Sequence, residues 1–137
     1  MNLQSLAEQK TAILNIARMT RSGGRLVLIE GFRDGFEILS RFRQSIGLPP
    51  VVPAPHNFYS SLVEIGLELS VYFTVERTWS TGLYDFLTRI VFPQLVGAES
   101  ATKPGEFHTK IEAIARAYDG PDMSKFARVH GFVLTRK

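Results

Sequence analysis

A Gly-Gly pair followed at once by a continuous apolar run is the feature that most constrains the fold of this chain. Gly23 and Gly24 follow a segment with helical spacing, and the apolar residues 26–29 come directly after Arg25. Glycine is favoured just past a helix end because it adopts the left-handed conformation without steric cost. An apolar run without polar alternation is typical of a strand covered on both faces, as in a sheet between helices. The segment therefore predicts an α/β fold.

The composition narrows the class of protein. With 137 residues, 45% of them hydrophobic, the chain is expected to fold as one domain, residues 1–137. The net charge of +3 is mixed along the chain without a basic stripe, so nucleic acid is not the expected partner. The absence of cysteine excludes disulfides and thiolate sites. No apolar run approaches the ~20 residues that span a bilayer, and the start lacks a signal-peptide core, so we expect a cytoplasmic protein without a membrane partner.

Helical and strand patterns alternate along the chain. A capping box at Ser5 and Glu8 predicts a helix over 6–20, and a second box at Asp34 and Glu37 predicts a helix that Gly47 ends. Residues 48–57 carry four of the seven prolines and are expected to form an ordered loop. The remaining expected elements are strand 25–30, a short helix from Ser61 that Gly66 stops, an alternating edge strand 67–76, helix 81–95, helix 107–118, a turn 119–122 and strand 128–135.

Residues 12–31 resemble the region of the fifth strand in class I S-adenosylmethionine-dependent methyltransferases of the type 11 kind. In that family an amphipathic helix leads into a basic residue, a Gly-Gly pair, a leucine, hydrophobic residues and a glutamate, as Arg21 to Glu30 do here. The family holds its methyl donor with a Gly-rich loop and an acidic residue that lie upstream of this point. Only Met1 to Gln4 precede the first expected helix. The resemblance therefore implies the C-terminal half of such an enzyme, without its cofactor-binding half.

The resemblance also implies a strand order. Strands 25–30, 67–76 and 128–135 correspond to the last three strands of the family's Rossmann-like sheet, the final one antiparallel and inserted between the other two. Residues 80–118 then form a helical insertion within the domain. One edge of strand 25–30 would face a strand that this chain does not contain, and an open apolar edge invites pairing. The edge is expected to be covered by a second copy of the chain, by a chain that carries the missing cofactor half, or by the displaced N-terminal helix. We therefore expect an oligomer through self-association, or association with the chain that carries the cofactor half.

Site residues follow from the resemblance in the first half of the chain. The turn Gly31–Gly35 borders the substrate pocket in related enzymes, so Arg33 is expected to bind substrate; the alternative is a plain turn. His56 and Asn57 end the proline-rich loop, which resembles a loop that closes on the methyl acceptor. Asn57 is expected to bind substrate and His56 to act as the catalytic base, because its unperturbed pKa of about 6.5 lies near neutrality. The alternative for His56 is a structural loop residue.

The second half adds candidates in the apolar helix 81–95, which in the family often forms part of a lid over the acceptor. Tyr84 and Arg89 are expected to bind substrate there, with core packing as the alternative for Trp79 and Tyr84. Glu30 either reaches a ligand from its strand end or pairs with a neighbouring arginine. His108 and His130 have no second ligand at metal-binding spacing, so no metal site is expected.

The function expected from this resemblance is the acceptor side of a methyltransferase that acts on a small molecule. S-adenosylmethionine is the cofactor expected for the complete enzyme, and this chain alone is expected neither to bind it tightly nor to be active. The alternative is a non-enzymatic interaction module, or inactive subunit, that pairs through its exposed sheet edge. A nucleic-acid-modifying subunit is a third hypothesis, suggested only by the positive charge.

Overall fold

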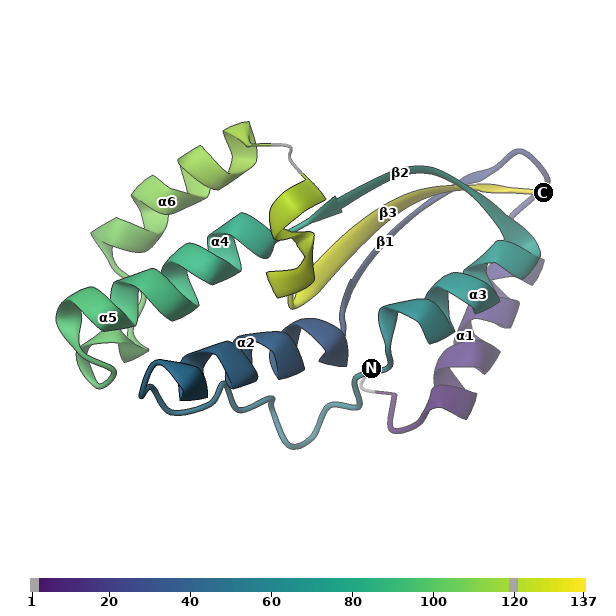
Figure 1. Ribbon diagram of the computed structural model, residues 1–137. Helices are drawn as coiled ribbons and strands as arrows, with labels where there is room; N and C mark the ends of the chain where they lie inside the picture. The colour runs from purple at the N-terminus through teal and green to yellow at the C-terminus, as the bar shows by residue number, and fades with distance from the viewer. Residues whose placement is uncertain (1–2, 119–120) are drawn as a thin grey trace. The chain divides into compact units, whose positions relative to one another are not determined.

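The computed structural model describes residues 3–118 and 121–137, so the turn expected over 119–122 lies partly outside the described residues. The chain forms two compact units: unit 1 comprises Met1–Arg33, Pro53–Trp79 and His130–Lys137, and unit 2 comprises Asp34–Val52 and Ser80–Val129. The elements (Figure 1) are α1 (Leu6–Met19), β1 (Arg25–Gly31), α2 (Arg33–Ser45), α3 (Leu62–Tyr72), β2 (Phe73–Ser80), α4 (Gly82–Phe86), the π-helix η1 (Leu87–Val91), α5 (Phe92–Val96), the 3-10 helix η2 (Ser100–Thr102), α6 (Glu106–Ala117), the 3-10 helix η3 (Pro121–Phe126) and β3 (Val129–Arg136).

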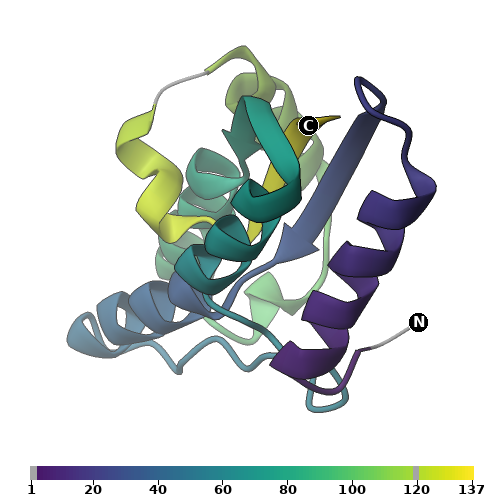
Figure 2. The same cartoon turned by 90° about the vertical axis from the view of Figure 1, so that its right-hand side faces the viewer.

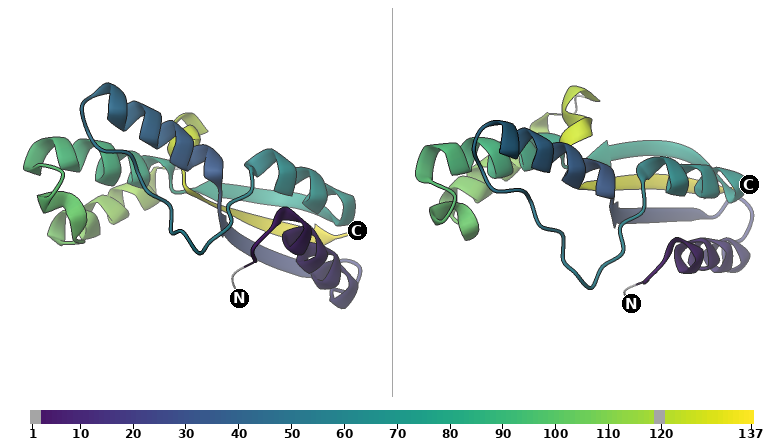
Figure 3. Two further views of the ribbon diagram at one scale, coloured as in Figure 1. Left: turned by 90° about the horizontal axis from the view of Figure 1, so that it is seen from below. Right: turned by 60° about the horizontal axis from the view of Figure 1, so that its bottom comes forward.

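Unit 1 is built on a three-stranded antiparallel sheet in the order β1-β3-β2 (Figure 3). The end of β3 pairs with the start of β1, because the Arg136 N–H donates to the Gly24 carbonyl at 2.8 Å. On the other side, the Lys137 N–H donates to the Tyr72 carbonyl at 3.1 Å. The central, antiparallel position of the last strand agrees with the strand order expected from the sequence. The fold is α/β, with helices that flank this sheet.

The core of unit 1 lies between one face of the sheet and the helices α1 and α3, which contact each other (Figure 2). Its buried side chains are Ile13, Ala17, Phe32, Ile65, Leu69, Phe73, Phe132 and Leu134. Leu26 and Leu28 of β1 pack against this core, whereas Val27 and Ile29 are 59% and 61% exposed. The expectation that this strand is covered on both faces is therefore wrong for the described residues. Within them, β1 pairs with β3 alone, so β1 is an edge strand.

The alternating segment 67–76 is the main error in the expected secondary structure. Helix α3 does not stop at Gly66 but continues to Tyr72, and the strand begins only at Phe73. The capping box of Ser61 and Glu64 is present and starts the helix. The inward side chains of α3 recur at helical spacing, while Val63, Leu67 and Val71, four residues apart, form an exposed apolar stripe. The exposed stripe and the buried residues Leu69 and Phe73 together produce the apparent strand alternation of the sequence.

The start of α2 also differs from the expected one. The helix begins at Arg33, so Asp34 lies in the first turn and not at the N-cap that a capping box requires. A carboxylate in the first turn still stabilises the helix through its dipole. The capping box expected at Ser5 and Glu8 is confirmed in part. One of its two hydrogen bonds is present, since the Ser5 hydroxyl accepts from the Glu8 N–H at 3.2 Å.

Unit 2 is helical, with α2, the continuous helical run 82–96, α6 and η3. Its core contains Leu39 from α2, Ile90 from η1 and Phe126 from η3. A β-carbon on Gly35 would lie 1.9 Å from the Ala127 carbonyl oxygen, so the backbone that follows η3 packs directly on α2. None of the described helices is both long and apolar enough to cross a membrane.

Candidate functional site

Unit 2 contains a cluster of polar side chains, formed around Asp85, Arg89, Arg43 and Arg128. A helical segment with irregular geometry carries the first two. Between α4 and α5 the chain forms the π-helix η1, and Pro93 follows in the first turn of α5. Proline has no N–H to donate to the carbonyl four residues earlier, which is that of Arg89. The Arg43 guanidinium of α2 donates to this carbonyl through Nη1, and its Nε donates to the Pro49 carbonyl at 2.5 Å. Arg43 therefore satisfies a backbone acceptor that the proline leaves open.

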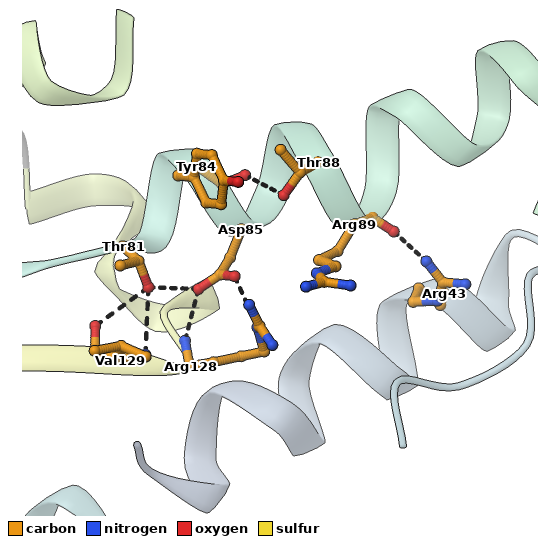
Figure 4. Close-up of polar contacts among 8 residues, drawn as sticks. All are labelled: Arg43, Thr81, Tyr84, Asp85, Thr88, Arg89, Arg128 and Val129. Atoms are coloured by element: carbon orange, nitrogen blue, oxygen red, sulfur yellow. Dashed lines mark hydrogen bonds and ion pairs between the residues drawn. The ribbon is translucent and has the colours of Figure 1, made fainter. Parts of the chain in front are cut away.

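Asp85, two residues before the π-helix, is the centre of the cluster and is 0% exposed (Figure 4). Its Oδ1 accepts from the Arg128 Nε at 2.7 Å, and its Oδ2 accepts from the Arg128 backbone N–H at 2.9 Å. The Thr81 hydroxyl also donates to Oδ2. A buried carboxylate is stable only when it is paired and hydrogen-bonded in this way. Asp85 thereby joins α4 to the segment that enters β3.

Arg89 lies one turn beyond Asp85, whose carboxylate is paired with Arg128. The pKa of Arg89 is lowered, first by burial and then by the positive charge of Arg128, while Asp85 and Tyr84 oppose the shift and Arg43 adds to it. Burial also lowers the pKa of Arg43, which is only 8% exposed. The Arg89 Nε is buried without a hydrogen-bond partner among the described residues. Figure 4 shows the three guanidinium groups in a row between α2 and the run 82–96, with one carboxylate beside them.

Tyr84 belongs to the same segment as Arg89. The Tyr84 carbonyl accepts from the Thr88 hydroxyl at 2.7 Å, and its side chain is partly buried. Because Tyr84 contributes to the pKa of Arg89, the two predicted substrate-binding residues of the helix are electrostatic neighbours. Both candidates of unit 2 thus lie on the same helical run, and Figure 4 draws no hydrogen bond between their side chains.

The other three predicted site residues belong to unit 1. Arg33 forms an exposed ion pair with Glu64, with 3.2 Å between Nη2 and Oε2. The pKa of Glu64 is lowered, chiefly by the hydrogen bond from the Ser61 backbone, and the Arg33 charge lowers it further. Arg33 thus has a structural partner at the start of α3.

The proline-rich loop presents His56 to solvent. The neighbouring Asn57 donates from Nδ2 to the Tyr59 hydroxyl at 3.1 Å. A general base is effective when a second group orients it against the proton that it removes. Within the described part of the chain, no hydrogen bond or ion pair orients the His56 ring, so its catalytic role stays a prediction.

The remaining candidates have local partners. Glu30 accepts from the Gly31 N–H at 2.9 Å, and the Trp79 indole covers Gly131, where a β-carbon would lie 2.1 Å from the ring. His108 accepts from the Gly105 N–H at 3.3 Å, and His130 contacts the Phe32 ring edge-on. Among the described residues, no three or more His, Cys, Asp or Glu side chains gather as metal ligands do.

Sequence reasoning did not select Asp85, Arg43 or Arg128. A lone carboxylate inside the apolar pattern of helix 81–95 is the signal that marks Asp85, because an unpaired charge at such a position is costly. Its partner lies 43 residues away and carries no local signal. Comparison of the chain with protein-family models, curated proteins and solved structures gives no match.

Proposed function

We propose that these residues form the acceptor side of a class I S-adenosylmethionine-dependent methyltransferase acting on a small molecule in the cytoplasm, inactive until a cofactor-binding part joins them. The observation that carries the proposal is β1: an apolar strand at the sheet edge, with Leu26 and Leu28 in the core and Val27 and Ile29 exposed. Such a strand is suited to a position inside a larger sheet with helices on both faces. The order β1-β3-β2 and the placement of α1 and α3 on one face support the same interpretation.

The chain's own residues do not fit the methyl donor. Its one Gly-Gly pair, Gly23 and Gly24, joins a helix to a strand, whereas a nucleotide loop joins a strand to a helix N-terminus. In this proposal unit 1 contributes acceptor binding by Arg33 and Asn57 and proton removal at His56. Tyr84 and Arg89 are proposed as acceptor-binding residues of unit 2.

The first test is isothermal titration of the chain with S-adenosylmethionine. We expect no measurable heat of binding at cofactor concentrations up to about 1 mM, because these residues lack the Gly-rich strand-to-helix loop with which this kind of fold holds a nucleoside cofactor. Tight binding by the 137-residue chain would contradict the proposal, since the cofactor site would then lie within it. A partner that carries a Gly-rich strand-loop-helix and restores cofactor binding on mixing would support it.

The second test concerns the uncovered face of β1. We expect the chain to self-associate at micromolar concentrations, and the double variant Val27→Lys, Ile29→Lys to weaken this association at least about tenfold, because lysine on an edge strand blocks pairing. Sedimentation velocity measures the effect. The matched control is Val63→Lys, at an exposed position on α3, which we expect to leave association unchanged.

The outcomes of the second test separate the two candidate functions. A tight homodimer that needs no cofactor would favour the alternative, an interaction module that pairs through the open edge of β1. A monodisperse monomer at high concentration would count against both. Equal effects of the α3 and β1 lysines would show that the association is non-specific.

A further inference from the structure

We propose that Arg89 in unit 2 binds an oxyanion, either a carboxylate or a phosphate group of a small molecule. The methyltransferase proposal already uses Arg89 for acceptor binding, and this inference names the chemistry of the ligand. Its observations do not depend on that proposal, because all the residues that carry it lie within unit 2. The three guanidinium groups of Arg43, Arg89 and Arg128 lie in a row beside one carboxylate, that of Asp85, so positive charge exceeds negative charge in this cluster.

Two of the three guanidinium groups have structural roles that account for them. Arg128 pairs with Asp85, and its guanidinium also lies 5.5 Å from the centre of the Phe36 ring. Arg43 donates to the carbonyls of Pro49 and Arg89. The Arg89 side chain has no comparable role, and its Nε is buried without a partner among the described residues. A buried donor left unsatisfied costs about 1–3 kcal/mol, more when it is charged.

The surroundings of Arg89 favour a negatively charged ligand over any neutral one. Asp85 accepts three hydrogen bonds from Arg128 and Thr81, and it compensates the Arg89 charge only in part, because the pKa of Arg89 is still lowered. The repulsion from Arg128 and Arg43 is relieved when an anion enters the row. Arginine also presents a planar fork of donors that matches carboxylate and phosphate oxygens.

The local backbone favours a role for Arg89 in binding. Arg89 lies in the five-residue π-helix η1, and such segments are frequent at functional sites because they cost stability in an ordinary helix. Pro93 explains why the Arg89 carbonyl needs Arg43, but it does not explain why the side chain at this position is a cation. An apolar residue would fill the same space without the desolvation penalty of a charge.

The experiment is an NMR titration of the intact chain, followed by thermal unfolding. Inorganic phosphate, succinate and acetate are each added against chloride at constant ionic strength, and the Arg89 Nε–Hε resonance is recorded. We expect this resonance to shift and saturate with at least one of these anions. Saturation by phosphate alone assigns a phosphate ligand, and saturation by succinate or acetate alone assigns a carboxylate. At about 100 times Kd the bound anion should raise Tm by about 5–10 °C.

The variant Arg89→Met and a matched control complete the design. Methionine keeps much of the apolar stem but removes the charge, so we expect the anion-dependent rise in Tm to disappear while Tm in chloride stays equal or increases. Arg41→Met, at an exposed position on the same helix as Arg43, should keep the full response. Phosphate raises the Tm of any protein to some extent, and this general rise is the same in the unmodified chain, Arg89→Met and Arg41→Met. It is therefore subtracted from the Tm shift of each. An unshifted Arg89 resonance in the unmodified chain, or an equal anion response in Arg89→Met, would overturn the proposal.

Discussion

Asp85→Asn is expected to lower the free energy of unfolding by about 3–5 kcal/mol, because breaking one side of a buried ion pair leaves the other charge uncompensated. Asp85 is fully buried, and asparagine keeps its shape while removing its charge. Arg128 would then lie beside Arg89 and Arg43 with no carboxylate in the cluster. Urea denaturation followed by far-UV circular dichroism measures the loss as a lower midpoint with an unchanged m-value.

A double-mutant cycle distinguishes the ion pair from a general loss of packing. Arg128→Met alone should also destabilise the chain, because it leaves the buried Asp85 carboxylate without its ion-pair partner. The combination Asp85→Asn, Arg128→Met should be less destabilised than the two single effects added together, with a coupling of about 1–3 kcal/mol. Glu112→Gln, which removes an exposed carboxylate paired with Arg116, is the control and should change stability by less than about 0.5 kcal/mol. Strict additivity would mean that the two side chains do not interact.

The elements that the sequence predicts well are those whose signals are local. Capping residues mark the start of α1 and α3, and the glycines at 47 and 97 end helical runs with φ of 77° and 85°. The error over 67–76 arose because an apolar stripe on the exposed face of α3 combined with the buried residues to imitate strand alternation. Gly66 added to the error, since glycine usually argues against a helix interior. Burial decides whether these apolar residues follow a helical or a strand period. Because burial depends on tertiary contacts, the sequence pattern alone does not show it.

The candidate site was less predictable than the fold because its contacts are distant in sequence. Arg89 and Tyr84 were selected from their place in an apolar helix, but the ion pair of Asp85 with Arg128 joins residues 43 apart. The contact of Arg43 with the Arg89 carbonyl joins residues 46 apart. Pro93 predicts a carbonyl without a helical N–H donor in its own helix, but no residue near it in the sequence identifies Arg43 as the donor to that carbonyl.

Gly35→Ala is expected to destabilise the chain by about 3 kcal/mol, although alanine is the better helix former. A β-carbon at Gly35 would lie 1.9 Å from the Ala127 carbonyl oxygen, 2.4 Å from its carbonyl carbon and 2.8 Å from the Arg128 nitrogen. These are backbone atoms, so no side-chain rotation relieves the overlap and the two segments must separate. Overpacking of this kind costs about 1–3 kcal/mol, occasionally more, and exceeds the ~1 kcal/mol that helix propensity returns.

Gly66→Ala is the matched control, because Gly66 lies inside α3 and a β-carbon there meets nothing within 4 Å. We expect this variant to be more stable by about 0.5–1 kcal/mol, which thermal unfolding resolves as a small rise in Tm. The Arg128 N–H that Gly35→Ala would displace is also a donor to Asp85. The losses of stability caused by Gly35→Ala and Asp85→Asn should therefore be non-additive. Asp85→Asn should cost less stability in the Gly35→Ala background, where the Arg128 N–H has already moved away from residue 85. Equal and stabilising effects of alanine at both glycines would contradict the close approach of Ala127 to α2.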